Sequence, residues 1–221
     1  MCIRDSVDTD SFKMGLRAAL RQDPDVVLIG EMRDAETIDT AMKAAETGHL
    51  LVSTLHTPDA QSTVLRVLAM FPPEEQDVVR VRLAESLHAV VSQRLLPKKT
   101  GGRVAALEIM VVTPTIRDLI LDKDRTGEIR DFIAEGREQY GMQTFDQHLT
   151  DLVQHDEVEF EVAIAASTRP SDFELKLKTF RRRSTTTKKV VDVPPEPPKS
   201  DPATLGGMDG MSTGFDFLQQ G

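Results

Sequence analysis

Two short aliphatic runs near the start of the chain flank a segment with helical spacing. Residues 26–30 and 50–54 are rich in Val, Leu and Ile and predict two fully buried strands. Between them, Asp34 caps a predicted helix whose apolar positions recur at i, i+3, i+4 and i+7 from Ile38, and Gly48 follows its end. This β-α-β pattern predicts an α/β fold with parallel neighbouring strands.

Most of the remaining pattern is helical. Apolar spacing and start signals predict helices at 11–21, 59–71, 73–91, 114–122, 127–138 and 145–155, and a third strand at 104–112. The best-marked start is Thr144, which forms a capping box with Gln147. The sequence therefore predicts an α/β part followed by a helical part.

Composition narrows the function classes. The 221 residues carry a formal charge of −9, which argues against a nucleic-acid-binding surface. No apolar run approaches the roughly 18–20 residues that span a bilayer. Cys2 is the single cysteine, so no internal disulfide is available and a reducing cytoplasm is expected.

The composition changes near Phe180. Residues 181–221 are rich in proline, glycine and serine or threonine, and they contain few large apolar residues. Such a segment cannot bury enough apolar surface to fold, so we predict a disordered tail with a polyproline II stretch at 194–198.

Glu31 is the strongest candidate for chemistry. It follows the predicted strand 26–30, at the sheet edge where open α/β folds bind ligands. An acid delivered there by a hydrophobic strand is the Walker B arrangement of P-loop ATPases. The alternative is a structural ion pair with Arg33. No G-x-x-x-x-G-K-[ST] phosphate loop occurs in the 221 residues.

A histidine is expected beside this acid. His56 follows strand 50–54, so it should lie near Glu31 and could sense a γ-phosphate or position water. His49 precedes that strand and should lie at its opposite end. A metal site of Glu46, His49 and His56 is the other interpretation, but their spacing matches no compact ligand pattern.

Two arginines lie four residues apart on the first predicted helix. Arg17 or Arg21 could stabilise transition-state charge in a neighbouring subunit. The structural alternative is an ion pair with Asp23 or Asp25.

Several collinear motifs resemble the secretion ATPase superfamily, and most closely its type IV pilus retraction (twitching motility) ATPases of the PilT/PilU kind. The motifs include Gly30-Glu31-Met32-Arg33-Asp34, Glu46-Thr47-Gly48-His49, Ser53-Thr54-Leu55-His56-Thr57, Gln93-Arg94-Leu95 and Glu108-Ile109-Met110. The resemblance covers about residues 7–180. It implies a partial RecA-like P-loop NTPase core over 7–112 and a C-terminal helical subdomain over 113–180.

The resemblance also implies residue roles. Glu31 would be the Walker B glutamate, and His49, Thr54 and His56 would belong to the family's His box and nucleotide site. Retraction ATPases carry an Ala-Ile-Arg-Asn-Leu-Ile motif needed for retraction, and residues 115–120 match it with Thr115 and Asp118 as departures. The matching positions expected to couple hydrolysis to the motor are Ile116, Arg117, Leu119 and Ile120.

Cofactors and partners follow from the same resemblance. The family hydrolyses ATP with Mg²⁺, forms homohexameric rings and acts with pilin and a membrane platform protein at the cytoplasmic face of the inner membrane. Its phosphate loop is missing here and residues 1–6 match nothing in it, so we expect a C-terminal fragment with a non-native start. The alternatives are a pilus assembly or type II secretion ATPase, and a non-catalytic fragment that interacts with a ring.

Overall fold

The computed structural model of the protein describes residues 12–22, 24–175 and 177–178. The predicted non-native start at 1–6 and the predicted disordered tail at 181–221 therefore lie outside the described residues.

Helices and strands alternate in the first half, and helices dominate the second. The strands are β1 (Val26–Ile29), β2 (Leu50–Ser53), β3 (Ala89–Pro97) and β4 (Arg103–Val111). The helices are α1 (Phe12–Leu20), α2 (Ala35–Glu46), α3 (Ala60–Ala69), α4 (Gln76–Ser86), α5 (Pro114–Leu121), the 3₁₀ turn η1 (Thr126–Glu128), α6 (Ile129–Glu135), α7 (Arg137–Tyr140), α8 (Phe145–Gln154) and α9 (Phe160–Ala166).

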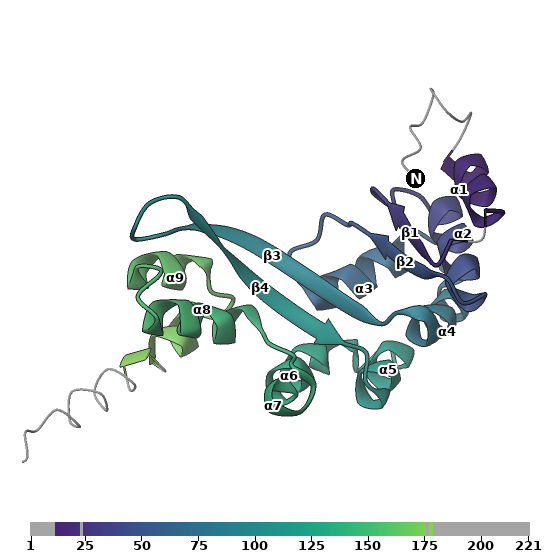
Figure 1. The fold of residues 1–221 in the computed structure, drawn as a ribbon. Coiled ribbons are helices and arrows are strands. Elements are labelled where there is room, and N and C mark those ends of the chain that lie inside the picture. Colours follow the sequence, from purple (N-terminus) through teal and green to yellow (C-terminus); the bar gives the residue numbers. More distant parts are fainter. Residues whose placement is uncertain (1–11, 23, 176, 179–221) are drawn as a thin grey trace, which may run out of the picture.

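The predicted β-α-β unit is confirmed. β1 and β2 pair in parallel, with Val26 opposite Leu50 and Ile29 opposite Ser53. The Asp34 side chain caps α2 by accepting a hydrogen bond from the Thr37 backbone N–H at 2.7 Å. α1 and α2 lie beside this two-stranded sheet (Figure 1).

The prediction that both strands are fully buried was wrong. Along β1 and β2 the side chains alternate, and those of Val26, Leu28, Leu50 and Val52 are exposed, Leu28 by 70%. Val27, Ile29 and Leu51 instead pack with Leu16 of α1 and Ala41 of α2. The aliphatic runs resemble fully buried strands, but helices cover one face of this pair.

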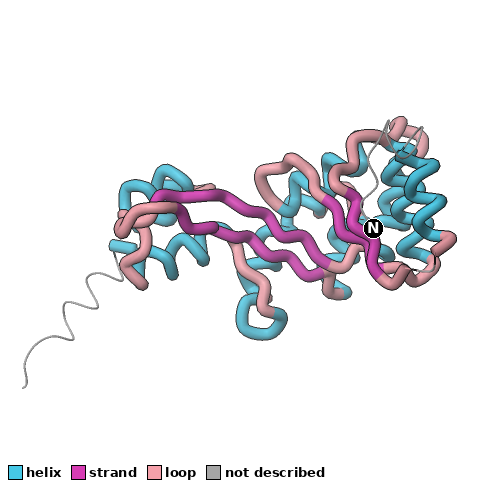
Figure 2. The backbone as a smooth tube through the Cα atoms, turned by 45° about the horizontal axis from the view of Figure 1, so that its top comes forward, coloured by secondary structure: helices cyan, strands magenta, loops and turns pink. Residues whose placement is uncertain are grey.

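A long antiparallel hairpin replaces part of a predicted helix. The pattern of Val79, Leu83, Leu87, Val90 and Val91 had predicted one helix through residue 91, but α4 ends at Ser86 and β3 begins at Ala89. β3 pairs with β4 along nine residues, from Ala89 opposite Val111 to Pro97 opposite Arg103. The hairpin runs from α4 and α5 to α8 and α9 (Figures 1 and 2).

The helical part also differs from its prediction in two places. The helix expected at 127–138 is divided into η1, α6 and α7, and the chain turns near Gly136. The capping box of Thr144 and Gln147 is confirmed at the start of α8. The pattern did not identify α9.

Two larger apolar clusters lie on either side of the hairpin's middle. The first joins α2, α3, α4, α5 and α6 to Met110 of β4. The second joins Leu96 of β3 and Ala106 of β4 to α8, α9 and Phe173. β3 and β4 therefore connect the two clusters. The domain division proposed at residue 113 stays a prediction.

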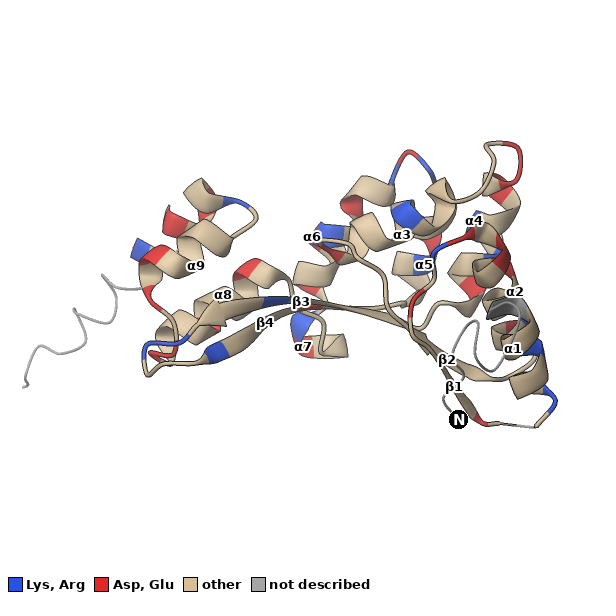
Figure 3. Cartoon of the chain, turned by 90° about the horizontal axis from the view of Figure 1, so that it is seen from above, with Lys and Arg blue, Asp and Glu red and all other residues tan. Residues whose placement is uncertain are grey.

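The described surface carries mixed charge. Lys and Arg residues are interspersed with Asp and Glu residues over most elements (Figure 3). Among the described helices, none is long and apolar enough to cross a membrane.

Candidate active site

The ends of β1 and β2 bring an acid and a histidine together, as the sequence predicted. Glu31 follows β1 by two residues and His56 follows β2 by three. The His56 Nε2 atom lies 3.3 Å from Glu31 Oε1, and the histidine side chain is 85% exposed. A polar pair therefore stands at the carboxyl edge of the parallel strands, where α/β folds bind ligands.

Arg33 occupies the other oxygen of the Glu31 carboxylate. Its Nε donates to Glu31 Oε2 at 2.7 Å, and its Nη2 lies 2.6 Å from the same oxygen. The Arg33 hydrogen bond is the main cause that lowers the pKa of Glu31, and the nearby His56 adds to the shift. The ion pair that was the structural alternative is thus present, and it leaves the acid ionised beside His56.

Backbone and hydroxyl contacts fix the two strand ends to each other. The Thr54 hydroxyl donates to the Gly30 carbonyl, and the Met32 N–H donates to the Thr54 carbonyl at 3.4 Å. Thr54 is therefore a positioning contact beneath the pair in this structure.

His49 lies away from this pair, as its place before β2 predicted. Its Nδ1 is 3.1 Å from the Ala44 carbonyl and 3.1 Å from the Thr47 hydroxyl, at the C-terminal end of α2. Glu46 of that helix end binds Arg82 instead. Within the described part of the chain, no group of three or more His, Cys, Asp or Glu side chains could hold a metal ion.

Arg17 and Arg21 lie on and just after α1. Their side chains are exposed, and α1 packs against α2 and the helix-covered face of β1. The structure does not bring them to Glu31 or His56 within this chain.

The apolar positions of the retraction-like motif at 115–120 are buried. Ile116, Leu119 and Ile120 are fully buried in α5 and pack in the first cluster. The Arg117 Nε donates to the Ala84 carbonyl of α4 at 3.2 Å. In return, Arg80 of α4 donates to the Ile120 carbonyl at 2.6 Å, so each helix binds a carbonyl near the other's C-terminus.

Sequence analysis missed the roles of two hairpin residues, Arg94 and Glu108. Glu108 on β4 is only 3% exposed, and it accepts a hydrogen bond from the Ala60 N–H at 2.9 Å. A charged residue within the apolar strand 104–112 was the available signal, because buried acids need donors. Burial is the largest influence on its pKa, which it raises.

Replacing Glu108 by Gln is expected to change the pH dependence of stability. Because the pKa of Glu108 is raised on folding, its contribution is complete below the ordinary Glu pKa and is lost as pH rises through the folded value. The free energy of unfolding of the wild type minus that of Glu108→Gln should therefore fall between pH 4 and neutrality. Urea unfolding of both proteins measures it, and a difference that grows with pH would contradict this expectation.

The chain matches a known family over most of its length. Residues 3–190 match the family model described as "Type II/IV secretion system protein". The protein is 49% identical over 166 residues to the "Type IV pilus retractation ATPase PilT" of Pseudomonas aeruginosa, covering 75% of this chain and 48% of that relative. It is 51% identical over 146 residues to a "Twitching motility protein" of Neisseria gonorrhoeae, covering 66% of this chain and 38% of that relative.

A solved structure shares the fold. The crystal structure of "the Pilus Retraction Motor PilT and Bound ADP" superposes with a TM-score of 0.66 at 43% identity, covering 76% of this chain and 47% of that chain. The protein thus spans about half the length, or less, of the relatives it matches.

Proposed function

Because the chain belongs to the type II/IV secretion system protein family, we propose that it is part of an ATP-hydrolysing motor that powers type IV pilus retraction. The observation that carries this proposal is the Glu31–His56 pair at the carboxyl ends of two parallel strands. ATP is the substrate, and retraction proceeds by depolymerisation of pilin.

Glu31 acts on the attacking water or on Mg²⁺. Its lowered pKa keeps the carboxylate ionised at neutral pH, which suits electrostatic orientation of water more than strong proton abstraction. Mg²⁺ is usually held by one or two carboxylates, substrate phosphates and waters, so a single partly exposed carboxylate fits this role. His56 reads the γ-phosphate from the adjacent strand end.

The other candidate residues act around this pair. Thr54 and His49 belong to the nucleotide site and its His box, and the place of His49 at the C-terminal end of α2 supports a contact separate from the pair. Arg17 and Arg21 supply positive charge in trans, since their exposed side chains lie away from the pair of their own chain.

The working form is a homohexamer at the cytoplasmic face of the inner membrane. It acts with a platform protein of that membrane and with the pilin machinery, and it does not act on nucleic acid. The mixed surface charge and the net charge of −9 support the last point.

Retraction is preferred to pilus assembly or type II secretion. The retraction and twitching names of the two relatives above support this choice, as does the near-match of residues 115–120 to the retraction motif. The non-catalytic alternative is a fragment that joins a ring without hydrolysing ATP.

A chimera tests the proposal. It joins the part of the Pseudomonas aeruginosa relative that precedes the matched segment to residues 12–178 of this chain. We expect the purified chimera to hydrolyse Mg-ATP and to restore pilus retraction in a strain that lacks that relative. A chimera that folds and assembles but does not hydrolyse ATP would favour the non-catalytic alternative, and one that hydrolyses ATP but extends pili would favour assembly.

A further inference from the structure

Arg94 and Glu108 lie on the same face of the hairpin. Each contacts two different parts of the chain that pack against this face. Arg94 of β3 pairs with Ala106, and Glu108 lies two residues further along β4, so both side chains point to the same face. One side of this face meets the loop 54–60, which carries His56 and leads into α3. The other meets α8 and α9.

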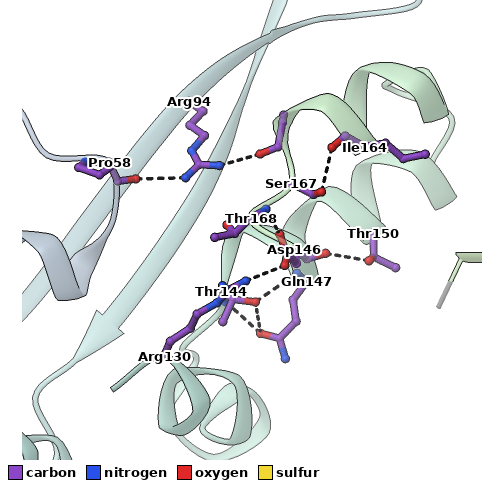
Figure 4. A network of polar contacts seen from close by, with 11 residues as sticks. Pro58, Arg94, Arg130, Thr144, Asp146, Gln147, Thr150, Ile164, Ser167 and Thr168 are labelled. Atoms are coloured by element: carbon purple, nitrogen blue, oxygen red, sulfur yellow. Dashed lines mark hydrogen bonds and ion pairs between the residues drawn. The ribbon is translucent and has the colours of Figure 1, made fainter. Parts of the chain in front are cut away.

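Arg94 bridges these two sides. Its Nη1 donates to the Ala166 carbonyl at the end of α9 at 2.6 Å, and its Nη2 reaches the Pro58 carbonyl at 3.4 Å (Figure 4). The guanidinium carbon also lies 3.9 Å from the centre of the Phe145 ring at the start of α8. Pro58 is two residues from His56.

Glu108 makes the same connection through backbone N–H groups. Its carboxylate accepts from the N–H of Ala60, the first residue of α3, and from the N–H of Phe145, the first residue of α8. Two helix N-termini thus meet at one buried acid, which accepts one backbone N–H from each.

The other contacts of the loop are to the end of β1 and to α3. Thr54 binds the Gly30 carbonyl, and the Thr57 and Thr63 hydroxyl oxygens lie 2.7 Å apart. His56 lies between these contacts, and its side chain is 85% exposed, with Glu31 Oε1 3.3 Å from its Nε2 atom. The place of its imidazole therefore depends on where the loop is held.

We propose that Arg94 and Glu108 are positioning residues that hold the loop 54–60 against α8 and α9 and thereby place His56 beside Glu31. This inference rests on the proposed function, in which the Glu31–His56 pair is the ATP site. A shift of α8 and α9 relative to the hairpin would pull on Pro58 and Ala60 together, so it would reach the pair through the loop.

Nuclear magnetic resonance of the 221-residue protein without nucleotide tests this role. The readout is the change in the His56 ring resonances caused by Glu31→Gln, measured with Arg94 present and in an Arg94→Ala background. We expect the change to be clear with Arg94 and to fall by at least half in the variant, because His56 would then lie away from Glu31 in most molecules. Amides of Leu55 and Thr57 should exchange on the order of tenfold faster in Arg94→Ala.

A matched variant separates positioning from general packing. Asp146→Asn removes the ion pair between Arg130 and the Asp146 carboxylate of α8 (2.7 Å) but leaves the Pro58 contact untouched. The Glu31 effect on His56 should survive in Asp146→Asn. An equal loss there, or an unchanged effect in Arg94→Ala, would overturn the proposal.

A second substitution covers the case in which Arg94→Ala does not fold. Arg94→Lys keeps a cation against Phe145 but lacks the planar fork that reaches two carbonyls. It should therefore weaken the effect of Glu31→Gln on the His56 resonances, though by less than Arg94→Ala does. An effect of Glu31→Gln as large in Arg94→Lys as in the wild type would overturn the proposal. The resonance experiment uses no nucleotide, so it is independent of the ATPase experiment. If the chimera is inactive but Arg94→Ala still weakens the effect of Glu31→Gln on His56, the ATPase proposal is rejected and the positioning role of Arg94 stands.

Discussion

Glu31→Gln in the chimera is expected to lower ATP turnover by on the order of 10²- to 10⁴-fold, the usual contribution of a group that acts on the attacking nucleophile. The amide keeps the shape of the side chain and removes its charge. Because Arg33 lowers the pKa of the Glu31 carboxylate, that charge is present throughout the neutral range. Steady-state phosphate release at saturating Mg-ATP measures the loss, and pilus retraction should stop with it.

Two comparisons show whether the loss belongs to this carboxylate. Glu138→Gln removes an exposed acid on α7, far from the strand ends in Figure 1, and should hydrolyse ATP at the rate of the parent chimera. Nucleotide binding by Glu31→Gln should remain, since positioning of water differs from binding of phosphate. Normal turnover in Glu31→Gln would exclude the proposed role, and loss of binding would assign Glu31 to the nucleotide contact itself.

Local signals predicted most helix starts correctly. Asp34 and Thr144 each cap the helix they were expected to begin, and Asp59 and Thr113 cap the helices predicted at 59–71 and 114–122. A capping side chain binds a backbone N–H three residues away, so its evidence lies entirely within a few residues of sequence. This is why boundaries marked by such residues were predictable.

The strand β3 was missed because its first residues continue a helical pattern. Val79, Leu83 and Leu87 are spaced four apart, and Val90 extends the series, although α4 ends at Ser86. The β-branched pair Val90-Val91 was the contrary signal. The pairing with β4 that decides the matter links residues up to 22 positions apart, from Ala89 to Val111.

The candidate site also has a part that local sequence predicts and a part that depends on distant contacts. The rule that parallel strands end at one edge was enough to predict Glu31 beside His56. The contact of Arg94 with Ala166 joins residues 72 positions apart and depends on the fold of the whole hairpin. A sequence can therefore indicate which acid and histidine meet at the edge of a sheet before it can indicate what holds the histidine in place.

Leu119→Ala is expected to lower the free energy of unfolding of the 221-residue protein by about 2–5 kcal/mol, the range for truncating a large buried aliphatic side chain. Leu119 is fully buried in α5 and packs in the cluster that joins α5 to α4 and α6. Urea unfolding monitored by circular dichroism measures the change. A domain of ordinary stability has only about 5–15 kcal/mol in total, so this variant should be close to unfolding in the cell.

Other positions of α5 separate stability from motor coupling. Leu121 is 40% exposed, so Leu121→Ala should cost far less than Leu119→Ala. Arg117→Ala removes one bond to the Ala84 carbonyl and should cost about 1 kcal/mol.

Loss of retraction with unchanged ATP turnover would therefore report coupling in Arg117→Ala, because the fold survives there. In Leu119→Ala, loss of retraction with unchanged ATP turnover would report coupling only if the variant were as stable as the wild type. Such stability would contradict the core role of Leu119. The buried positions of the motif thus hold α5 on α4, and Arg117 is the member that can be tested for coupling without unfolding the helix pair.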